Sequence, residues 1–237
     1  KKKRNLALGI ALGAMLGVGL ALLREQLDNT IKSPEALEEV AGTGVVGYIP
    51  FDKKLVTAHA IAFDTDNGGT AEGFRKLRTN LKFLAVDNPP RLIVVTSSSP
   101  SEGKSTTSIN IALALAEAGH SVVLVDGDLR RPRLANYLDL VGAAGFSTVL
   151  SGGASLDDVL QQTKFSQLTV LTAGSIPPNP SELLGSLATK KMFSDLRARF
   201  DYIIVDSSPL LAVTDGAILA AEADGALVAV RAGKTKR

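Results

Sequence analysis

The stretch TSSSPSEGKST, from Thr96 to Thr106, constrains the fold of this chain more than any other feature. It ends in Gly103-Lys104-Ser105 and lies between an apolar run, RLIVVTSS, and a segment with apolar residues at helical spacing. A loop between a buried strand and a helix can surround phosphate groups with backbone N–H groups at the helix N-terminus. The pattern therefore predicts a strand, a phosphate-binding loop and a helix in succession.

This loop departs from the usual spacing G-x-x-x-x-G-K-[ST], because Ser98 stands at the first glycine. That glycine mainly eases a tight turn, and Ser98 followed by Ser99-Pro100 can also turn. We therefore expect the loop to bind ATP, with Lys104 supplying positive charge and the Ser105 hydroxyl holding Mg²⁺. The expected nucleotide-binding residues are Ser101, Glu102, Gly103, Lys104, Ser105 and Thr106.

Acidic residues follow two further apolar runs. VVLVDGDLRRP carries Asp126 and Asp128 and then Arg130, and YIIVDSSP ends its run at Asp206. In an open α/β sheet, ligands bind outside the carboxyl ends of the strands, so these side chains should converge beside the loop. The alternative is that the aspartates are only solvated strand ends. Convergence predicts a Mg²⁺–nucleotide site with Ser105, Asp126, Asp128 and Asp206 as candidate metal ligands.

The expected fold class is α/β: a P-loop NTPase-like, doubly wound and mainly parallel sheet flanked by helices. Weaker patterns add helices at SLDDVLQQ, SELLGSL and TDGAILAAEA, and strands at LTVLTAG and GALVAVRAG. The chain then stops at KTKR, and we expect the C-terminal part of the sheet to be truncated. It also begins with Lys, so we interpret it as a fragment of a longer protein.

Composition excludes several kinds of site. The chain has no cysteine, which rules out disulfides, iron–sulfur clusters and Cys-bound zinc, and its two histidines are far apart in sequence. The net charge is only +2, so charge alone gives no support for a nucleic-acid partner.

A membrane-spanning helix is expected at the N-terminus. Leu6–Leu23 contains no charge and would form a helix about 27 Å long, close to the hydrocarbon thickness of a bilayer. A signal peptide would be shorter and would not run directly into REQLDN. The leading cluster of Lys1, Lys2, Lys3 and Arg4 favours a cytoplasmic N-terminus, whereas an ATP-using domain must itself be cytoplasmic. An earlier span in a longer protein would resolve this conflict, and we expect the nucleotide domain inside.

The predicted organisation is a membrane helix with its basic flank at 1–23, a juxtamembrane segment and linker at 24–69, and the nucleotide domain at 70–237. Within the linker, SPEALEEV has a capping Ser33 before Pro34 and predicts a helix. GVVGYIP predicts a short strand or an extended segment, and residues 51–69 predict a flexible connector. An amphipathic helix should follow over Thr70–Leu84, with Thr70 as its cap.

Taken together, these motifs resemble the bacterial tyrosine kinases of the polysaccharide co-polymerase type. SSSPSEGKST is similar to their Walker A motif, VVLVDGDLRRP to their Walker A′ motif and YIIVDSSP to their Walker B motif. ALLREQLDNTIKSPEALEE is similar to the segment after the second membrane helix of the fused co-polymerase part.

The resemblance implies a protein-tyrosine kinase that uses ATP and Mg²⁺, lies in the inner or plasma membrane, and regulates capsular or exopolysaccharide polymerisation and export. It implies autophosphorylation in trans within a homo-oligomer. Glu72, Arg75 and Arg78 match the E-x-x-R-x-x-R motif of the family's ring interface; from the residues alone, local ion pairing on one helix is the alternative.

The resemblance also implies roles for the catalytic residues. Lys104 would bind the phosphates, and Ser105 and Asp206 would serve Mg²⁺ directly or through water. Asp126 would face the incoming phenol as base or orienter, Asp128 would support the metal, and Arg130 would help to balance charge.

Two departures from the family pattern matter. Ser101 replaces a usual glycine, and the tyrosine-rich C-terminal tail is missing, leaving only Tyr48, Tyr137 and Tyr202. A nucleotide-switched membrane scaffold that controls polysaccharide chain length without kinase activity is therefore an alternative. A ParA/MinD-like ATPase is a second alternative, although Ser99 replaces the additional lysine of those proteins.

Overall fold

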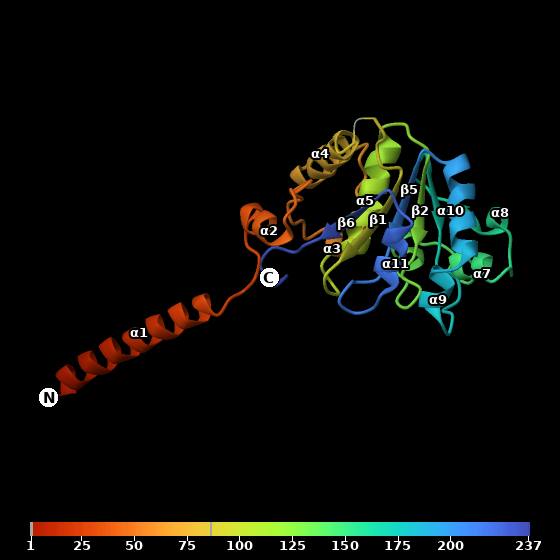
Figure 1. The fold of residues 1–237 in the computed structure, drawn as a ribbon. Helices are drawn as coiled ribbons and strands as arrows, with labels where there is room; N and C mark the ends of the chain where they lie inside the picture. Colours follow the sequence, from red (N-terminus) through yellow and green to blue (C-terminus); the bar gives the residue numbers. More distant parts are fainter. Residues whose placement is uncertain (1, 86) are drawn as a thin grey trace.

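The chain is built around a six-stranded sheet with the order β3-β4-β2-β5-β1-β6 (Figure 1). All neighbouring strands run parallel except β3 and β4. The structure is a computed structural model that describes residues 2–85 and 87–237; Lys1, part of the expected basic cluster, lies outside them. The strands are β1 (Leu92–Ser97), β2 (Val122–Asp126), β3 (Leu160–Gln162), β4 (Leu168–Leu171), β5 (Tyr202–Asp206) and β6 (Gly225–Ala229).

Helices cover both faces of this sheet, which confirms the predicted α/β class. On one face, α4 and α5 bury Phe74, Leu77 and Ile109 against the strands. On the other, α7, α10 and α11 contribute Phe146, Phe193 and others to a second core. The helices are α1 (Lys2–Gln26), α2 (Pro34–Ala41), α3 (Leu55–Ala58), α4 (Gly69–Phe83), α5 (Lys104–Glu117), α6 (Leu134–Leu138), α7 (Phe146–Leu150), α8 (Leu156–Val159), α9 (Pro180–Leu184), α10 (Leu187–Arg199) and α11 (Asp215–Ala221).

The three strands that carry the predicted site are fully buried, as their continuous apolar runs require. Each lies within the predicted range: β1 within RLIVVTSS, β2 within VVLVDGDLRRP and β5 within YIIVDSSP. One weaker prediction was wrong in part. SLDDVLQQ forms only the short helix α8 and then continues as β3, an antiparallel strand at the edge of the sheet.

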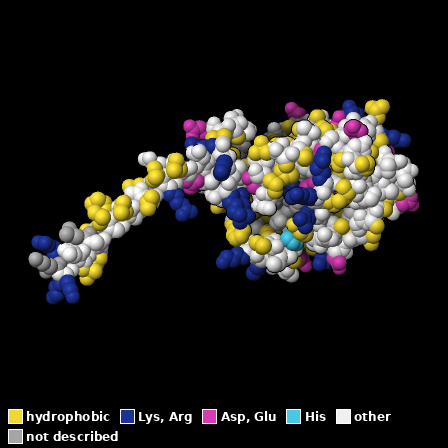
Figure 2. Space-filling view, turned by 90° about the horizontal axis from the view of Figure 1, so that it is seen from below, with side chains coloured by type: hydrophobic (Ala, Val, Ile, Leu, Met, Phe, Trp, Pro, Cys, Tyr) yellow, Lys and Arg dark blue, Asp and Glu magenta, His cyan; other side chains and the backbone are white. Residues whose placement is uncertain are grey.

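Helix α1 carries no charge between Leu6 and Leu23, exposes the large apolar side chains that the structure describes there, and projects away from the body of the molecule (Figures 1 and 2). It is long and apolar enough to cross a membrane. Helix α2 begins as predicted: Ser33 Oγ accepts a hydrogen bond from the Ala36 N–H, and Pro34 occupies the first turn.

The segment between α2 and α4 matches expectation only in part. GVVGYIP forms no strand in the described structure, so of its two predicted forms the strand is wrong. Residues 51–69, expected to be a flexible connector, include α3 and bury Ile61 and Phe63 in the core. Asn110 of α5 fixes this segment, because it accepts the Ile61 N–H and donates to the His59 carbonyl. Finally, Thr70 donates to the Pro50 carbonyl, and Gly68, not Thr70, caps α4.

Candidate nucleotide-binding site

Two residues near the C-terminal end of the phosphate-binding loop, Ser101 and Gly103, have a left-handed backbone conformation. Gly103 has φ +95° and is the N-terminal cap of α5, where a residue with a side chain would be strained. Ser101 has φ +66°, although it is not glycine. Ser98 is not among the left-handed residues that the structure describes, so a glycine is not required there. The missing first glycine therefore leaves the loop intact, and the residue under backbone strain is Ser101.

Glu102 holds this loop in shape. Its carboxylate accepts hydrogen bonds from the Ser99 N–H, at 2.9 Å, and from the Thr235 hydroxyl. Thr235 belongs to the segment after β6, whose Arg231 also donates to the Ser101 carbonyl. The predicted residue Glu102 thus lies within the loop, and its carboxylate binds the protein's own groups.

Lys104 lies among carboxylates at the carboxyl edge of the sheet. Its Nζ is 3.0 Å from Asp128 Oδ2, 3.5 Å from Asp206 Oδ2 and 3.3 Å from Ser105 Oγ. Burial opposes its charge, but the carboxylates of Asp206 and Asp128 outweigh that effect and raise the pKa of Lys104. The predicted convergence of loop and strand ends is therefore present.

Asp206 and Asp128 are each oriented by a serine. The Asp206 carboxylate is fully buried and accepts a hydrogen bond from Ser108 of α5, at 3.1 Å. Asp128 Oδ1 accepts hydrogen bonds from the Ser208 hydroxyl, at 2.8 Å, and from the Arg131 N–H. Burial raises the pKa of Asp206, because the charged form loses its hydration.

Asp126 is a further carboxyl group of the site whose pKa is raised. Its Oδ2 accepts the N–H groups of Arg133 and Leu134, while its buried Oδ1 has no hydrogen-bond partner in the described structure. Burial, together with the neighbouring Asp206, raises the pKa of Asp126 to about 7. A carboxyl group poised near neutral pH can hold or accept a proton, as a general base must.

Two observations indicate that a divalent cation fits between these side chains. Asp126 Oδ1 and Asp206 Oδ2 are buried oxygens without hydrogen-bond partners, and the ammonium group of Lys104 stands beside Asp206 and Asp128. Among the described residues, no group of three His, Cys, Asp or Glu side chains could hold a metal by itself. Mg²⁺ would therefore depend on Ser105, water and phosphate oxygens as well, which is its usual form of coordination.

Arg130 binds side chains of the protein itself, namely Asp215 and Ser181. Its Nε is 2.7 Å from Asp215 Oδ2, and its Nη2 donates to Ser181 Oγ. Ser181 also donates to Asp215 Oδ1, at 2.6 Å, and the Asp215 side chain is fully buried. This network ties the loop after β2 to the starts of α9 and α11.

In the E-x-x-R-x-x-R motif, the two arginines bind within the chain, whereas the glutamate is exposed. Arg75 and Arg78 each lie 2.9 Å from the Glu117 carboxylate at the end of α5, and Arg78 also donates to the Ala114 carbonyl. Glu72 is exposed and 3.9 Å from Arg75. The two arginines therefore clamp α4 onto α5 within one chain, and Glu72 remains accessible.

Sequence reasoning missed four residues that shape the site. Ser108 lies four positions after Lys104, a helical spacing that could have revealed it. Gly127 packs so closely that a Cβ would lie 2.9 Å from the Asp206 carbonyl oxygen and 2.8 Å from Leu219. Ser208 and Asp215 carried no signal, because only the fold brings them to Asp128 and Arg130.

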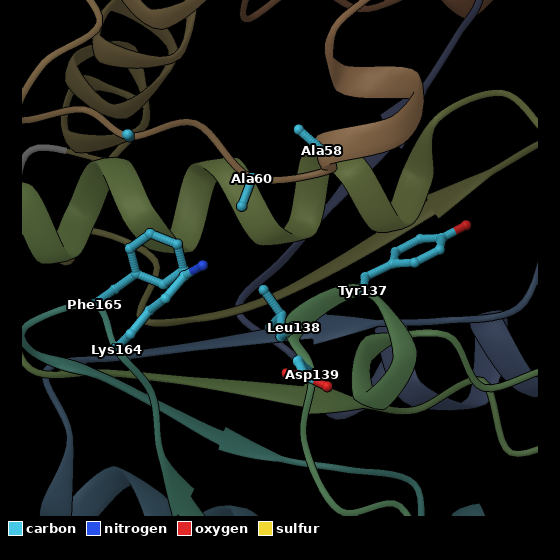
Figure 3. Close-up of a pocket in the computed structure, with 8 residues that line it drawn as sticks. Ala58, Ala60, Tyr137, Leu138, Asp139, Lys164 and Phe165 are labelled. Carbon is cyan, nitrogen blue, oxygen red and sulfur yellow. The ribbon is translucent and has the colours of Figure 1, made fainter.

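A separate surface hollow lies away from these residues. It is lined by Ala60, Tyr137, Lys164 and Phe165 among others, and Figure 3 shows them between α5, α6 and the β3–β4 connection. Tyr137 stacks on His59, with ring centroids 3.6 Å apart. None of the loop residues or strand-end aspartates lines this hollow.

Comparison with known proteins identifies relatives of this chain. The profile of the family described as "AAA domain" matches residues 91–235. The chain is 38% identical to the tyrosine-protein kinase YwqD of Bacillus subtilis over 179 residues, which cover 76% of each protein. It is 34% identical to the tyrosine-protein kinase ptk of Acinetobacter johnsonii over its whole length, which spans only 34% of that protein.

Solved structures show the same relationship. The kinase domain of the Escherichia coli tyrosine kinase ETK aligns over 85% of this chain and 82% of its own, with 30% identity and a TM-score of 0.78. The septum site-determining protein MinD of Pyrococcus horikoshii, solved with Mg-ADP, aligns over 59% and 57%, with 25% identity and a TM-score of 0.51. The fold is thus one in which nucleotide and Mg²⁺ occur together, and it matches the kinase domain over more of the chain than it matches MinD.

Proposed function

Because the chain belongs to the family of bacterial tyrosine-protein kinases, we propose that it transfers the γ-phosphate of ATP to protein tyrosine. One observation carries this proposal. Lys104 at the start of α5 lies within 3.5 Å of two strand-end carboxylates, Asp128 and Asp206, beside a third, Asp126, whose pKa is raised to about 7. Phosphoryl transfer needs such an arrangement, because it depends on positioning and charge neutralisation.

In the proposed roles, the N–H groups of Ser101–Thr106 bind the β- and γ-phosphates, and Lys104 moves from the carboxylates to the phosphate oxygens. Ser105, Asp126, Asp128 and Asp206 would hold Mg²⁺, directly or through water. Bound there, the ion would neutralise negative charge on the phosphates. Asp126 receives the proton of the incoming tyrosine hydroxyl, which is scarcely ionised at neutral pH. Arg130, held by Asp215, orients the loop that carries Asp128.

The proposed cellular setting follows from the family and from α1. Residues 1–23 anchor the chain in the inner or plasma membrane, 24–69 connect the anchor, and 70–237 form the kinase domain, placed in the cytoplasm where ATP is available. Autophosphorylation occurs in trans within a homo-oligomer, with Glu72 as the accessible member of its interface. The regulated process is capsular or exopolysaccharide polymerisation and export.

The deciding experiment incubates the full chain, reconstituted in nanodiscs, with labelled ATP, Mg²⁺ and a tyrosine-rich peptide. We expect label on peptide tyrosine from the native chain and none from Lys104→Met. Thermal unfolding of both proteins without nucleotide controls for folding. Nucleotide binding without transfer would instead support the membrane scaffold, and ATP hydrolysis without label on tyrosine would support the ParA/MinD-like ATPase.

A further inference from the structure

A basic surface lies where the body of the molecule meets the segment after α1. We call it the membrane-proximal surface; it is formed by Phe51, Lys53, Lys54, Val56, Arg231, Lys234, Lys236 and Arg237. Figure 2 shows Lys and Arg side chains gathered at the end of the body that faces α1. The surface joins two distant parts of the sequence, the α3 region and the segment after β6.

Backbone pairing ties this surface to α1. Thr30 forms a β-bridge with Lys236, the Ile31 N–H donates to the Thr235 carbonyl at 2.9 Å, and the Arg237 N–H donates to the Asn29 carbonyl. Helix α1 ends at Gln26, only four residues before Thr30. Four extended residues span at most about 14 Å, so Thr30, the bridge partner of Lys236, lies within that reach of the end of the apolar helix.

The surface combines free positive charge with exposed apolar side chains. Lys53, Lys54, Lys234, Lys236 and Arg237 are exposed, and none of them takes part in an ion pair within the described residues. Phe51 and Val56 are 67% and 61% exposed, and the Arg231 guanidinium lies 5.4 Å from the Phe51 ring. Aromatic and apolar groups beside lysines are typical of surfaces that enter the headgroup layer of a bilayer.

Four acidic residues near the membrane segment bind groups outside the membrane-proximal surface or backbone N–H groups. Glu25 and Asp28 both pair with Lys32, Asp52 accepts the Lys54 N–H, and Glu38 accepts the Val45 N–H. The other carboxylates of α2, Glu35 and Glu39, are carried by a separate helix. The lysines and Arg237 of the membrane-proximal surface pair with none of these carboxylates and remain available for an anionic partner.

We propose that the membrane-proximal surface binds anionic phospholipid headgroups of the bilayer that α1 enters. This binding rests on the proposed membrane insertion, and it fixes the side of the domain that carries Arg231 and Thr235 against the membrane. Those two residues bind Ser101 and Glu102, so the phosphate-binding loop would sit just behind the lipid-binding side. Electrostatic attraction of this kind acts within roughly one Debye length, about 8 Å at physiological salt.

The experiment uses the absence of cysteine, which makes a single introduced cysteine a unique label site. The full chain carrying Val56→Cys is labelled with an environment-sensitive dye and reconstituted in nanodiscs with increasing phosphatidylglycerol in phosphatidylcholine. We expect a blue shift of the dye that grows with the anionic lipid and disappears near 1 M salt. Each neutralised lysine should weaken the attraction about fivefold, so Lys53→Gln/Lys54→Gln should lose most of the shift.

Two matched controls isolate the surface. Lys190→Gln/Lys191→Gln removes the same charge from α10 and should keep the shift. A dye at Leu187→Cys, 81% exposed on α10, should not respond to anionic lipid. Equal spectra in neutral and anionic discs, or an equal response at Leu187→Cys, would overturn the proposal. If the chain failed to co-elute with the discs, membrane insertion itself would be contradicted. If the chain only failed to label tyrosine, the proposed kinase activity would be contradicted, and the blue shift of the dye would still test lipid binding.

Discussion

Asp126 and Asp206 are register partners at the carboxyl ends of the adjacent parallel strands β2 and β5, so two buried carboxyl groups lie next to one another. Lys104 is the cation that stands beside Asp206 in this arrangement. Two ionised carboxylates in such a place repel each other and have lost their hydration. A bound cation would lower the electrostatic energy of the two carboxylates, which is a reason for the site to bind one.

Asp126→Asn should raise stability at high pH while it abolishes phosphoryl transfer. The raised pKa of Asp126, about 7, means that the folded state keeps a proton that the unfolded chain loses near pH 4. The stability that protonated Asp126 gives the folded state is fully present below about pH 4 and is lost as the pH rises through 7. A rise from 3.8 to about 7 corresponds to about 4 kcal/mol, so we expect the variant to exceed the native chain by up to that amount at pH 8 and nearly to match it at pH 4.

Denaturation of both nucleotide-free proteins at pH 4 and pH 8 measures this difference. Asp195→Asn, at an exposed carboxyl group on α10, provides the control and should show no pH-dependent gain. An equal gain of Asp126→Asn at the two pH values would mean that titration of Asp126 is not its cause.

Ser101→Gly should stabilise the chain by about 0.5–1 kcal/mol, because Ser101 has φ +66° and glycine adopts this conformation without strain. Gly103→Ala is the reverse change at a second left-handed position, where φ is +95°. No neighbouring atom lies within 4 Å of the added Cβ, so the variant should lose about 1 kcal/mol of stability through backbone strain alone. Thermal unfolding without nucleotide measures both. A less stable Ser101→Gly variant would show that the side chain of Ser101 contributes more than its strain costs.

Glu117→Gln should destabilise the chain by about 1 kcal/mol at neutral pH, because Arg75 and Arg78 both bind this carboxylate. Although burial opposes ionisation, the two arginines lower the pKa of Glu117 below its usual value of 4.5. Its contribution is therefore present above about pH 4.5 and lost as the pH falls further. Denaturation at pH 7 and pH 3 tests this, with the difference from the native chain shrinking at pH 3.

Glu72→Gln is the matched change at the other acidic position of this region. Glu72 is exposed and lies 3.9 Å from Arg75, so stability should change by less than about 0.5 kcal/mol. If Glu72 belongs to the oligomer interface, analytical ultracentrifugation should nevertheless show weaker self-association. Unchanged self-association would remove Glu72 from the proposed interface. Arg75 and Arg78 variants cannot give this answer, because they also release α4 from α5.

Asp215→Asn should lower both stability, by about 2 kcal/mol, and the rate of phosphoryl transfer. The change removes the buried charge that binds Arg130 and so loosens the loop that carries Asp128. Ser181→Ala removes one hydrogen bond of the same network and should cost about 1 kcal/mol. Denaturation and tyrosine labelling measure the two effects. A stable Asp215→Asn variant with full activity would show that Arg130 needs no anchor.

Much of the architecture could be read from local patterns. Continuous apolar runs mark β1, β2 and β5, because strands of a parallel sheet are covered on both faces. The acidic residues that follow them predicted where the site lies, since parallel strands deliver their carboxyl ends to one edge. Short elements were less predictable: β3 follows α8 without a break, because pairing with β4 overrides the helical pattern of SLDDVLQQ.

Neighbouring residues encode the apolar helix α1, the strand–loop–helix unit around Lys104 and the acidic strand ends, so each of these could be predicted before the fold was known. Which partners these groups have depends on the tertiary structure. It bound Arg130 to Asp215, both arginines of α4 to Glu117, and Thr235 to Glu102. These contacts join residues far apart in the chain, and only the folded packing of helices, loops and sheet brings them within hydrogen-bonding distance.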